Sequence, residues 1–254
     1  MSTPSHRLKI QRAAEHFADL QDIVAPIEAR RPHTVRETFN SERQEWEYRL
    51  RLDGADPPER FPIVLGDFLF NVRSALDHLI VAVAPHHRKP NIDFPIFVFD
   101  PFVRDEASGD YLHPKARRGW LKATKGLPDD LIAALNVLQP YEAARRFSRR
   151  ANDHPLAILH EIQNADKHRE LVGLATGLRR ADVNVDGTVT GIVPVLKDGT
   201  LMETYGDKVH MEIEGSAIVG VEWAGATADF QDFGRLLLAF VLDEVFPRVE
   251  PFLG

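Results

Sequence analysis

Residues 61–84, FPIVLGDFLFNVRSALDHLIVAVA, are the stretch that decides the fold. On a helical wheel at about 100° per residue, the apolar side chains of this stretch fill one broad side. The opposite side carries a narrow polar stripe with i, i+4, i+7 and i+11 spacing: Asp67, Asn71, Ser74 and His78. Arg73 and Asp77 lie four residues apart on the flank of the stripe and can bridge each other. The stretch therefore predicts an amphipathic helix over residues 62–84.

The composition of this stripe predicts that another part of the protein covers it. Its side chains are short and end in hydrogen-bonding groups. It contains neither lysine nor glutamate, which are the usual choices for a side that faces solvent. Since buried polar groups need hydrogen-bond partners, we expect a second polar stripe to supply them.

That second stripe lies in residues 153–171, DHPLAILHEIQNADKHREL. Three polar side chains group within about one sixth of the helical wheel, with Lys167 beside them: Glu161, Asn164 and His168. Asp153 as N-cap, Pro155 after it and Gly177 as terminator predict a helix over residues 154–176. Because both stripes combine histidine with carboxylate and amide neighbours, we expect any chemistry to lie where the stripes meet.

Hydrophobic periodicity predicts the remaining elements. Apolar residues at helical spacing predict three more helices, over residues 4–30, 128–139 and 228–248. Alternating side chains predict a half-buried strand over 44–52, and a short strand over 94–99 inside an otherwise irregular segment, 85–126. Short β-rich pieces separated by Asp-Gly and Gly-Asp turns predict an antiparallel meander over 182–223.

Together these elements predict an α+β fold, with a bundle of about five helices and one antiparallel sheet that strand 44–52 joins. The length of 254 residues fits a single domain, 1–254. Within this domain we expect a helical body, 1–181 and 226–254, and a β insertion, 182–225.

The composition of the chain excludes several classes of site and argues against others. The chain has no cysteine, which excludes disulfides, thiol nucleophiles and thiolate metal sites. Its formal net charge of −7 argues against a broad surface that coats nucleic acid. The N-terminal residues lack the apolar core of a signal peptide, and charged residues interrupt the longest apolar stretch. Glycine-rich phosphate loops are absent. We therefore expect a cytoplasmic protein with no membrane partner and no cofactor.

Arg73 and His78 form an R-x4-H motif on the first key helix. This motif resembles the signature of HEPN-type helical domains, in which an arginine, a following polar residue (here Ser74) and a histidine define the site. The resemblance covers residues 66–80 and implies a metal-independent ribonuclease whose site forms at a homodimer interface. There, histidine and arginine would promote attack of an RNA 2′-hydroxyl on the adjacent phosphate, by proton transfer and by charge stabilisation.

Two features shape this interpretation. Arg73 lies about 140° around the helix from His78, so a second helix or a second subunit must complete the site. The β insertion departs from a plain helical HEPN bundle.

The sequences SALDH at 74–78 and DKHR at 166–169 also resemble those of a bacterial protein family. The catalytic set that we expect comprises Asn71, Arg73, Ser74, Asp77, His78, Glu161, Asn164, Lys167 and His168.

RNA is the expected partner under this interpretation. Charged side chains interleaved with aromatic ones are typical of surfaces that contact RNA. Near Tyr141 and Phe147 the sequence places three arginines that fit this pattern: Arg145, Arg146 and Arg149.

Two other interpretations stay open. In the first, a helix bundle binds zinc, manganese or iron through Asp67, His78, Glu161 and His168. Neither the Glu-x-x-His nor the His-Glu-x-x-His spacing of known metal helices is present, however. In the second, the stripes form a buried network of His, Asn and Glu hydrogen bonds that fixes helix register in a non-enzymatic binding or scaffold protein.

Overall fold

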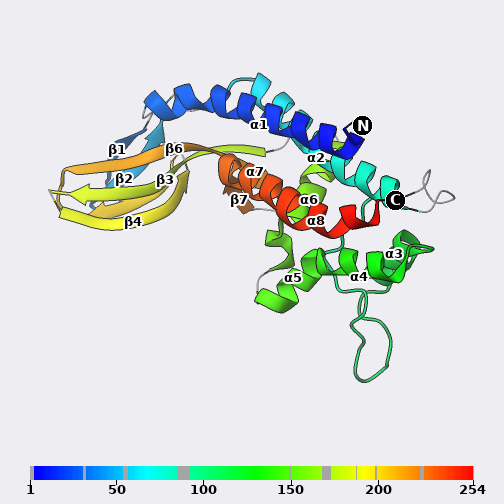
Figure 1. Cartoon of the computed structure of the whole chain (residues 1–254). Helices are drawn as coiled ribbons and strands as arrows, with labels where there is room; N and C mark the ends of the chain where they lie inside the picture. Colours follow the sequence, from blue (N-terminus) through cyan, green and yellow to red (C-terminus); the bar gives the residue numbers. More distant parts are fainter. Residues whose placement is uncertain are drawn as a thin grey trace. The chain divides into compact units, whose positions relative to one another are not determined.

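Helices and β-strands both occur in the computed structural model, which describes residues 3–30, 33–53, 57–84, 92–148, 150–167, 173–186, 188–197, 199–223 and 226–253 (Figure 1). Its α-helices are α1 (Ser5–Arg30), α2 (Arg60–Val83), α3 (Pro114–Thr124), α4 (Asp129–Val137), α5 (Pro140–Phe147), α6 (Pro155–Lys167), α7 (Phe230–Ala239) and α8 (Phe246–Val249). A 3-10 turn, η2 (Ala151–Asp153), precedes α6, and a π-helical turn, η3 (Phe240–Val245), joins α7 to α8. A short 3-10 turn, η4 (Glu250–Phe252), follows α8.

The strands form two antiparallel sheets, which together with the helices confirm the α+β class. They are β1 (His33–Asn40), β2 (Glu45–Leu52), β3 (Gly173–Val185), β4 (Thr188–Lys197), β5 (Leu201–Tyr205), β6 (Met211–Trp223) and β7 (Ala226–Asp229). One sheet has the order β1-β2-β5 and the other β4-β3-β6-β7.

The chain divides into two compact units. The helical unit comprises Met1–Phe17, Leu65–Leu171 and Phe233–Gly254, and the sheet unit comprises Ala18–Val64 and Val172–Asp232. Helices α1, α2 and α7 contribute residues to both units. The single-domain organisation, with its helical body and β insertion, stays a prediction.

The helices predicted over 4–30 and 62–84 are confirmed as α1 and α2. Elsewhere proline changes the expected boundaries. The helix predicted over 128–139 is α4 followed at once by α5, because Pro140 occupies the first turn of α5, where its missing N–H costs nothing. Pro114 starts α3 in the same way, inside the segment that was predicted to be irregular. The last helix begins two residues later than predicted, since β7 extends to Asp229.

The helix predicted over 154–176 is too long. Helix α6 ends at Lys167, and residues from Gly173 onwards belong to β3. There the backbone pairs with β6, for example Gly173 with Glu222 and Leu174 with Val221. Glycine and β-branched residues are weak helix formers, so sheet pairing prevails over the helical pattern at Gly173, Thr176 and Gly177.

The strand predicted over 94–99 is absent from the structure, in which this segment is neither helix nor strand. Side chains, rather than a neighbouring strand, bind its backbone. The fully buried Gln139 accepts a hydrogen bond from the N–H of Phe97 (2.9 Å) and donates one to the carbonyl of Pro95 (3.1 Å). Because these peptide groups already have side-chain partners, the segment forms no ladder with a neighbouring strand.

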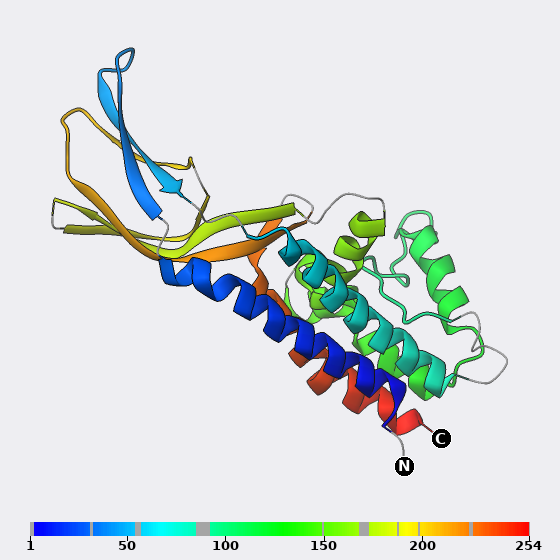
Figure 2. The same cartoon turned by 90° about the horizontal axis from the view of Figure 1, so that it is seen from above.

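The strands predicted over 182–223 are antiparallel, but the prediction of one sheet that strand 44–52 joins was wrong. β6 pairs with β3 in one sheet, whereas β5 pairs with β2, the strand predicted at 44–52, in the other (Figure 2). The preceding strand β1 was not predicted. In the turn between β1 and β2, the Asn40 side chain accepts hydrogen bonds from the N–H groups of Glu42 and Arg43.

Tyr48 of β2 is the centre of the small core in the sheet unit. The tyrosine is fully buried and packs with Met211 of β6. Its hydroxyl donates a hydrogen bond to the carbonyl of Val209 (2.9 Å) and accepts one from the N–H of the same residue (2.8 Å). One side chain thus satisfies both groups of a peptide segment that precedes β6.

In the helical unit, α1, α2 and α7 meet around the ring of Phe17. This ring lies 5.5 Å, centroid to centroid, from the ring of Phe68 on α2. On α7 it faces Gly234, where an added Cβ would overlap the ring itself. Gly234 therefore permits a close approach of two helices that any larger residue would prevent.

We expect Gly234→Ala to destabilise the protein by about 1–3 kcal/mol, because the new methyl group must displace the Phe17 ring. Gly66 on α2 is the matched control, since a Cβ at that position meets nothing within 4 Å. Gly66→Ala should leave stability unchanged or raise it by up to about 1 kcal/mol through helix propensity. Chemical denaturation of both variants measures the difference. Equal effects of the two substitutions would contradict this packing.

Candidate functional site

The polar stripe of α2 is only partly covered. Asp67 is exposed, Ser74 and His78 are half-buried, and Asn71 is buried. Asn71 finds its partner on its own helix, where its amide donates to the carbonyl of Asp67 (2.8 Å). The opposite side of α2 is buried as predicted, at Leu65, Phe68, Leu69, Val72, Ala75, Leu76 and Leu79.

Arg73 and Asp77 form the predicted ion pair and use it to hold a peptide group. The Arg73 guanidinium donates to the Asp77 carboxylate through Nε (3.1 Å) and to the carbonyl of Phe94 through Nη2 (3.0 Å). The same carboxylate accepts a hydrogen bond from the N–H of Phe94 (2.9 Å). Their side chains are 20% and 30% exposed, so solvent weakens these bonds little. Arg73 is therefore fixed to the Phe94 segment.

Helix α6 contacts α2 through a residue outside the predicted set. Gln163 donates from its amide to the carbonyl of Leu69 (3.0 Å), nine residues before His78. Nine residues correspond to about 13 Å along a helix axis. Asn164 bonds to His160 on its own helix (3.1 Å), and Glu161 is half-buried. Among the described residues, no hydrogen bond or ion pair links Glu161 or Asn164 to the polar stripe of α2.

Part of the predicted site lies outside the described residues, namely His168, Arg149 and the side chain of Lys167. The expected meeting of His78 with His168 therefore stays a prediction. Within the described part of the chain, no three His, Asp or Glu side chains gather closely enough to hold a metal ion.

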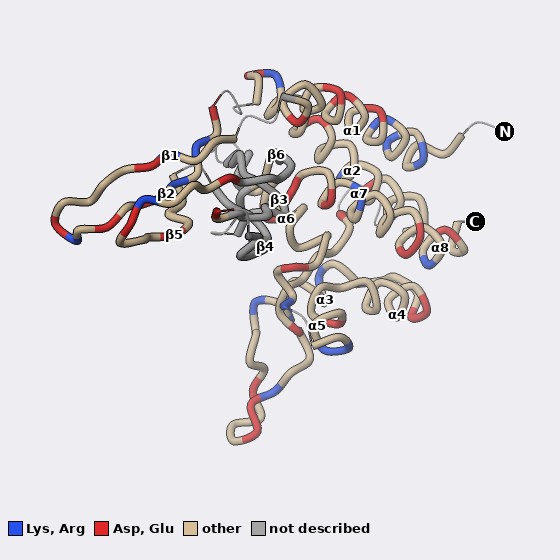
Figure 3. The backbone as a smooth tube through the Cα atoms, turned by 90° about the vertical axis from the view of Figure 1, so that its left-hand side faces the viewer, with Lys and Arg blue, Asp and Glu red and all other residues tan. Residues whose placement is uncertain are grey.

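The arginines predicted to contact RNA are bound to a buried carboxylate. Arg145 and Arg146 both bond to Glu142, whose side chain is 3% exposed, at 2.8 and 2.7 Å. Burial raises the pKa of the Glu142 carboxyl, but the hydrogen bonds from the two arginines outweigh burial and lower it below its ordinary value. Figure 3 shows acidic and basic positions interspersed along α1 and along the β1–β2 hairpin.

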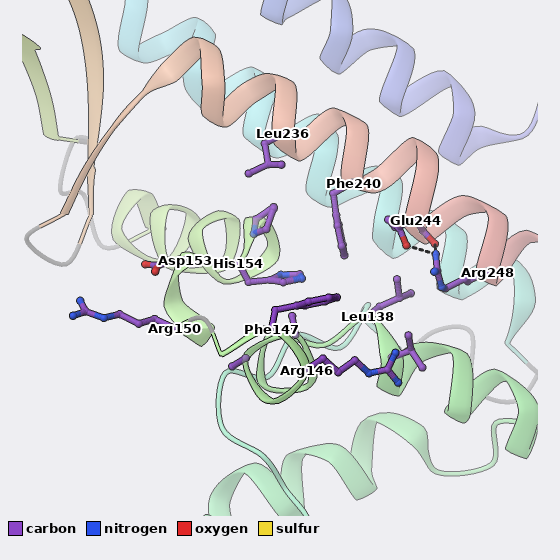
Figure 4. A pocket seen from close by; sticks show the side chains of 14 residues that line it. Leu138, Arg146, Phe147, Arg150, Asp153, His154, Leu236, Phe240, Glu244 and Arg248 are labelled. Atoms are coloured by element: carbon purple, nitrogen blue, oxygen red, sulfur yellow. Dashed lines mark hydrogen bonds and ion pairs between the residues drawn. The ribbon is translucent and has the colours of Figure 1, made fainter. Parts of the chain in front are cut away.

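A cavity of about 340 Å³ lies within the helical unit, and sequence analysis missed it. Its walls come from α4, α5, the η2–α6 junction and the helix formed by α7, η3 and α8. Figure 4 shows Phe147, His154 and Phe240 converging on it. Arg146, Arg150, Asp153, Glu244 and Arg248 supply charged groups to its lining.

His154 is a titratable residue of the cavity lining whose ring is packed against an aromatic side chain and hydrogen-bonded to the backbone. Its ring packs edge-on against Phe240, with centroids 4.7 Å apart. Its Nδ1 accepts a hydrogen bond from the N–H of Leu156 (3.2 Å) and so caps the first turn of α6. Burial lowers the pKa of His154 to about 4. The ring is therefore neutral near pH 7, and because Nδ1 is an acceptor, the proton resides on Nε2.

Asp153 was predicted to be the N-cap of the helix that starts near Pro155. In the structure Asp153 ends η2, and His154 directly precedes α6. The other lining residues belong to helices that are far apart in sequence, and no local spacing unites them. The one available signal was a histidine at a helix start, where a cation is disfavoured by the helix dipole.

Comparisons of the chain with family models, with curated proteins and with solved structures found no match. No helix among the residues described here combines the length and the apolar character that crossing a membrane requires.

We expect His154 to make folding stability fall as the pH falls from about 6.5 to about 4. In this window the unfolded state binds a proton that the folded state does not, since the folded pKa is about 4 and the ordinary value is 6.5. The loss amounts to about 3 kcal/mol at the acidic end. His154→Asn keeps a capping acceptor and removes the titration. Denaturant unfolding at several pH values should give a flatter profile for this variant, and identical profiles would disprove the assignment.

Proposed function

We propose that this protein binds a small molecule with a largely apolar body in the cavity between α5, α6 and the α7–η3–α8 helix. The observation that carries the proposal is the wall formed by Phe147, Phe240 and the neutral ring of His154 around a cavity of about 340 Å³. Small-molecule sites are typically concave and mainly apolar, with a few oriented polar groups. This cavity combines those properties.

The exposure of its apolar lining supports the proposal. Phe147 is 68% exposed and Leu236 is 54% exposed, although both lie at the cavity. Exposed apolar surface that gathers in one place is costly in water and is a common mark of a binding site. A ligand that covers these side chains gains the free energy of removing them from water.

The π-helical turn η3 also supports a binding role. A π-helical turn is a rare departure from the α-helix and occurs often at functional sites. Phe240 is the first residue of this turn, and Glu244 lies in the same turn. Both residues line the cavity, so the irregular turn coincides with its wall.

The neutral fluorescent probe N-phenyl-1-naphthylamine tests this proposal. We expect a saturable rise in fluorescence with one site per chain. Phe147→Ala should weaken the affinity by about tenfold, since the variant loses most of one buried aromatic contact.

Phe99→Ala is the matched control, because Phe99 is similarly exposed (60%) but packs against His113 away from the cavity lining. It should bind the probe as the wild type does. Absence of saturable binding, or equal losses in the two variants, would overturn the proposal.

Metal-independent cleavage of RNA, with α2 in a homodimer interface, is a second candidate function. Two observations favour it. Ser74 and His78 lie one helical turn apart and are half-buried, so part of each residue is open to solvent. Phe70 on the same helix is 61% exposed, and it could stack on a base or contact a second copy. In this proposal Arg73 positions the helix through Phe94 rather than contacting phosphate.

We expect cleavage of a single-stranded RNA in EDTA to fall at least about a hundredfold in His78→Gln, which removes the proton-transfer group. His113→Gln is the control, since His113 is also half-buried but lies at the start of α3. Thermal unfolding of each variant separates lost activity from lost folding. Cleavage that persists in folded His78→Gln would refute this candidate, as would a wild-type protein that cleaves no RNA.

A further inference from the structure

The charged groups around the cavity are not balanced. Two of them neutralise each other, because Arg248 donates to the carbonyl of Glu244 (2.9 Å) and forms an ion pair with its carboxylate. Asp153 is the other acidic group of the lining, which also contains Arg146 and Arg150. The lining therefore carries three arginines and two carboxylates, in a chain whose net charge is −7.

Arg146 is held in place before any ligand arrives. Its Nε donates to the buried carboxylate of Glu142 (2.7 Å), while its side chain remains 51% exposed. Glu142 also forms an ion pair with Arg145. The cluster of Glu142, Arg145 and Arg146 therefore has one negative and two positive charges, which leaves a net positive charge. The terminal nitrogens of an arginine fixed through Nε are free to form a two-pronged bond to an anion.

His154 adds a neutral donor to the same cavity. Its Nδ1 is occupied by the N–H of Leu156, so Nε2 carries the hydrogen. A neutral N–H suits an acceptor oxygen and offers nothing to a cation. In Figure 4 the side chains of Arg150 and Arg146 lie on opposite sides of His154 and extend away from its ring.

We infer that the ligand of this cavity is an amphipathic anion, with an aromatic or alkyl body against Phe147 and Phe240 and one carboxylate, sulfonate or phosphate group on Arg146. This inference rests on the proposed binding function and specifies its ligand class. The apolar body supplies affinity, and the fixed guanidinium selects for charge. A cationic amphiphile is disfavoured, because the carboxylates nearest to the cavity already have arginine partners, apart from the exposed Asp153.

Two fluorescent probes that differ by one sulfonate group test the inference. 8-Anilino-1-naphthalenesulfonate carries the anion, and N-phenyl-1-naphthylamine is the same body without it. We expect the anionic probe to bind the wild type about tenfold more tightly than the neutral probe, as a charge-assisted hydrogen bond at a partly exposed site predicts. Added salt should weaken the anionic probe and leave the neutral probe unchanged.

Arg146→Gln and Arg145→Gln form a matched pair of variants. Both arginines bond to Glu142 from the same helix, but only Arg146 belongs to the cavity lining. Arg146→Gln should abolish the preference for the anionic probe, measured as the ratio of the two probe affinities within the same variant. Arg145→Gln should retain the preference. Both variants keep one arginine on Glu142, so neither leaves that carboxylate buried without a partner.

The outcomes separate the two proposals. Neutral-probe binding without a preference for the anion, or a preference that survives Arg146→Gln, overturns the ligand class and leaves the binding function standing. Failure of both probes to bind saturably overturns the binding function itself. Anionic-probe binding that is insensitive to Phe147→Ala places the probe elsewhere and overturns the inference.

Discussion

The helical unit depends on how one short segment, Phe94 to Phe97, satisfies its backbone. Arg73 and Asp77 bind both peptide groups of Phe94, and Gln139 binds the carbonyl of Pro95 and the N–H of Phe97. These side chains belong to α2 and to the start of α5, so the segment fixes one helix against the other. Because α5 supplies Phe147 and Arg146, the shape of the cavity depends on the same hydrogen bonds.

Local hydrophobic periodicity correctly predicted α2 and β2, whose residues follow a regular helical or alternating pattern. The spacing in residues 61–84 gave the correct helix and the correct buried side, and alternation gave β2. The end of α6 and the partner of β5 depend on pairing with strands distant in sequence, which no local pattern records. The segment at 94–97 has the composition of a strand, but side chains from α2 and from the start of α5 bind its backbone in place of a neighbouring strand.

In the candidate site, too, a local ion pair was predicted and contacts between residues distant in sequence were not. The Arg73–Asp77 pair was predicted from its spacing, but its use in binding Phe94 was not, because that contact joins residues 17 and 21 positions apart. Arg145 and Arg146 were predicted to contact RNA, but their bonds to a glutamate three and four residues earlier were not predicted. Lining residues such as Leu138, His154 and Phe240 share no period, so the cavity became visible only in three dimensions.

The binding of residues 94–97 by side chains also affects how the protein behaves at high concentration. An apolar run such as Phe-Pro-Ile-Phe would be prone to recruit a second chain by strand addition if its peptide groups were open. Proline contributes no N–H at 95, and the N–H and C=O of Phe94, the carbonyl of Pro95 and the N–H of Phe97 are already occupied. The contacts that order the fold therefore also remove a template for amyloid-like association.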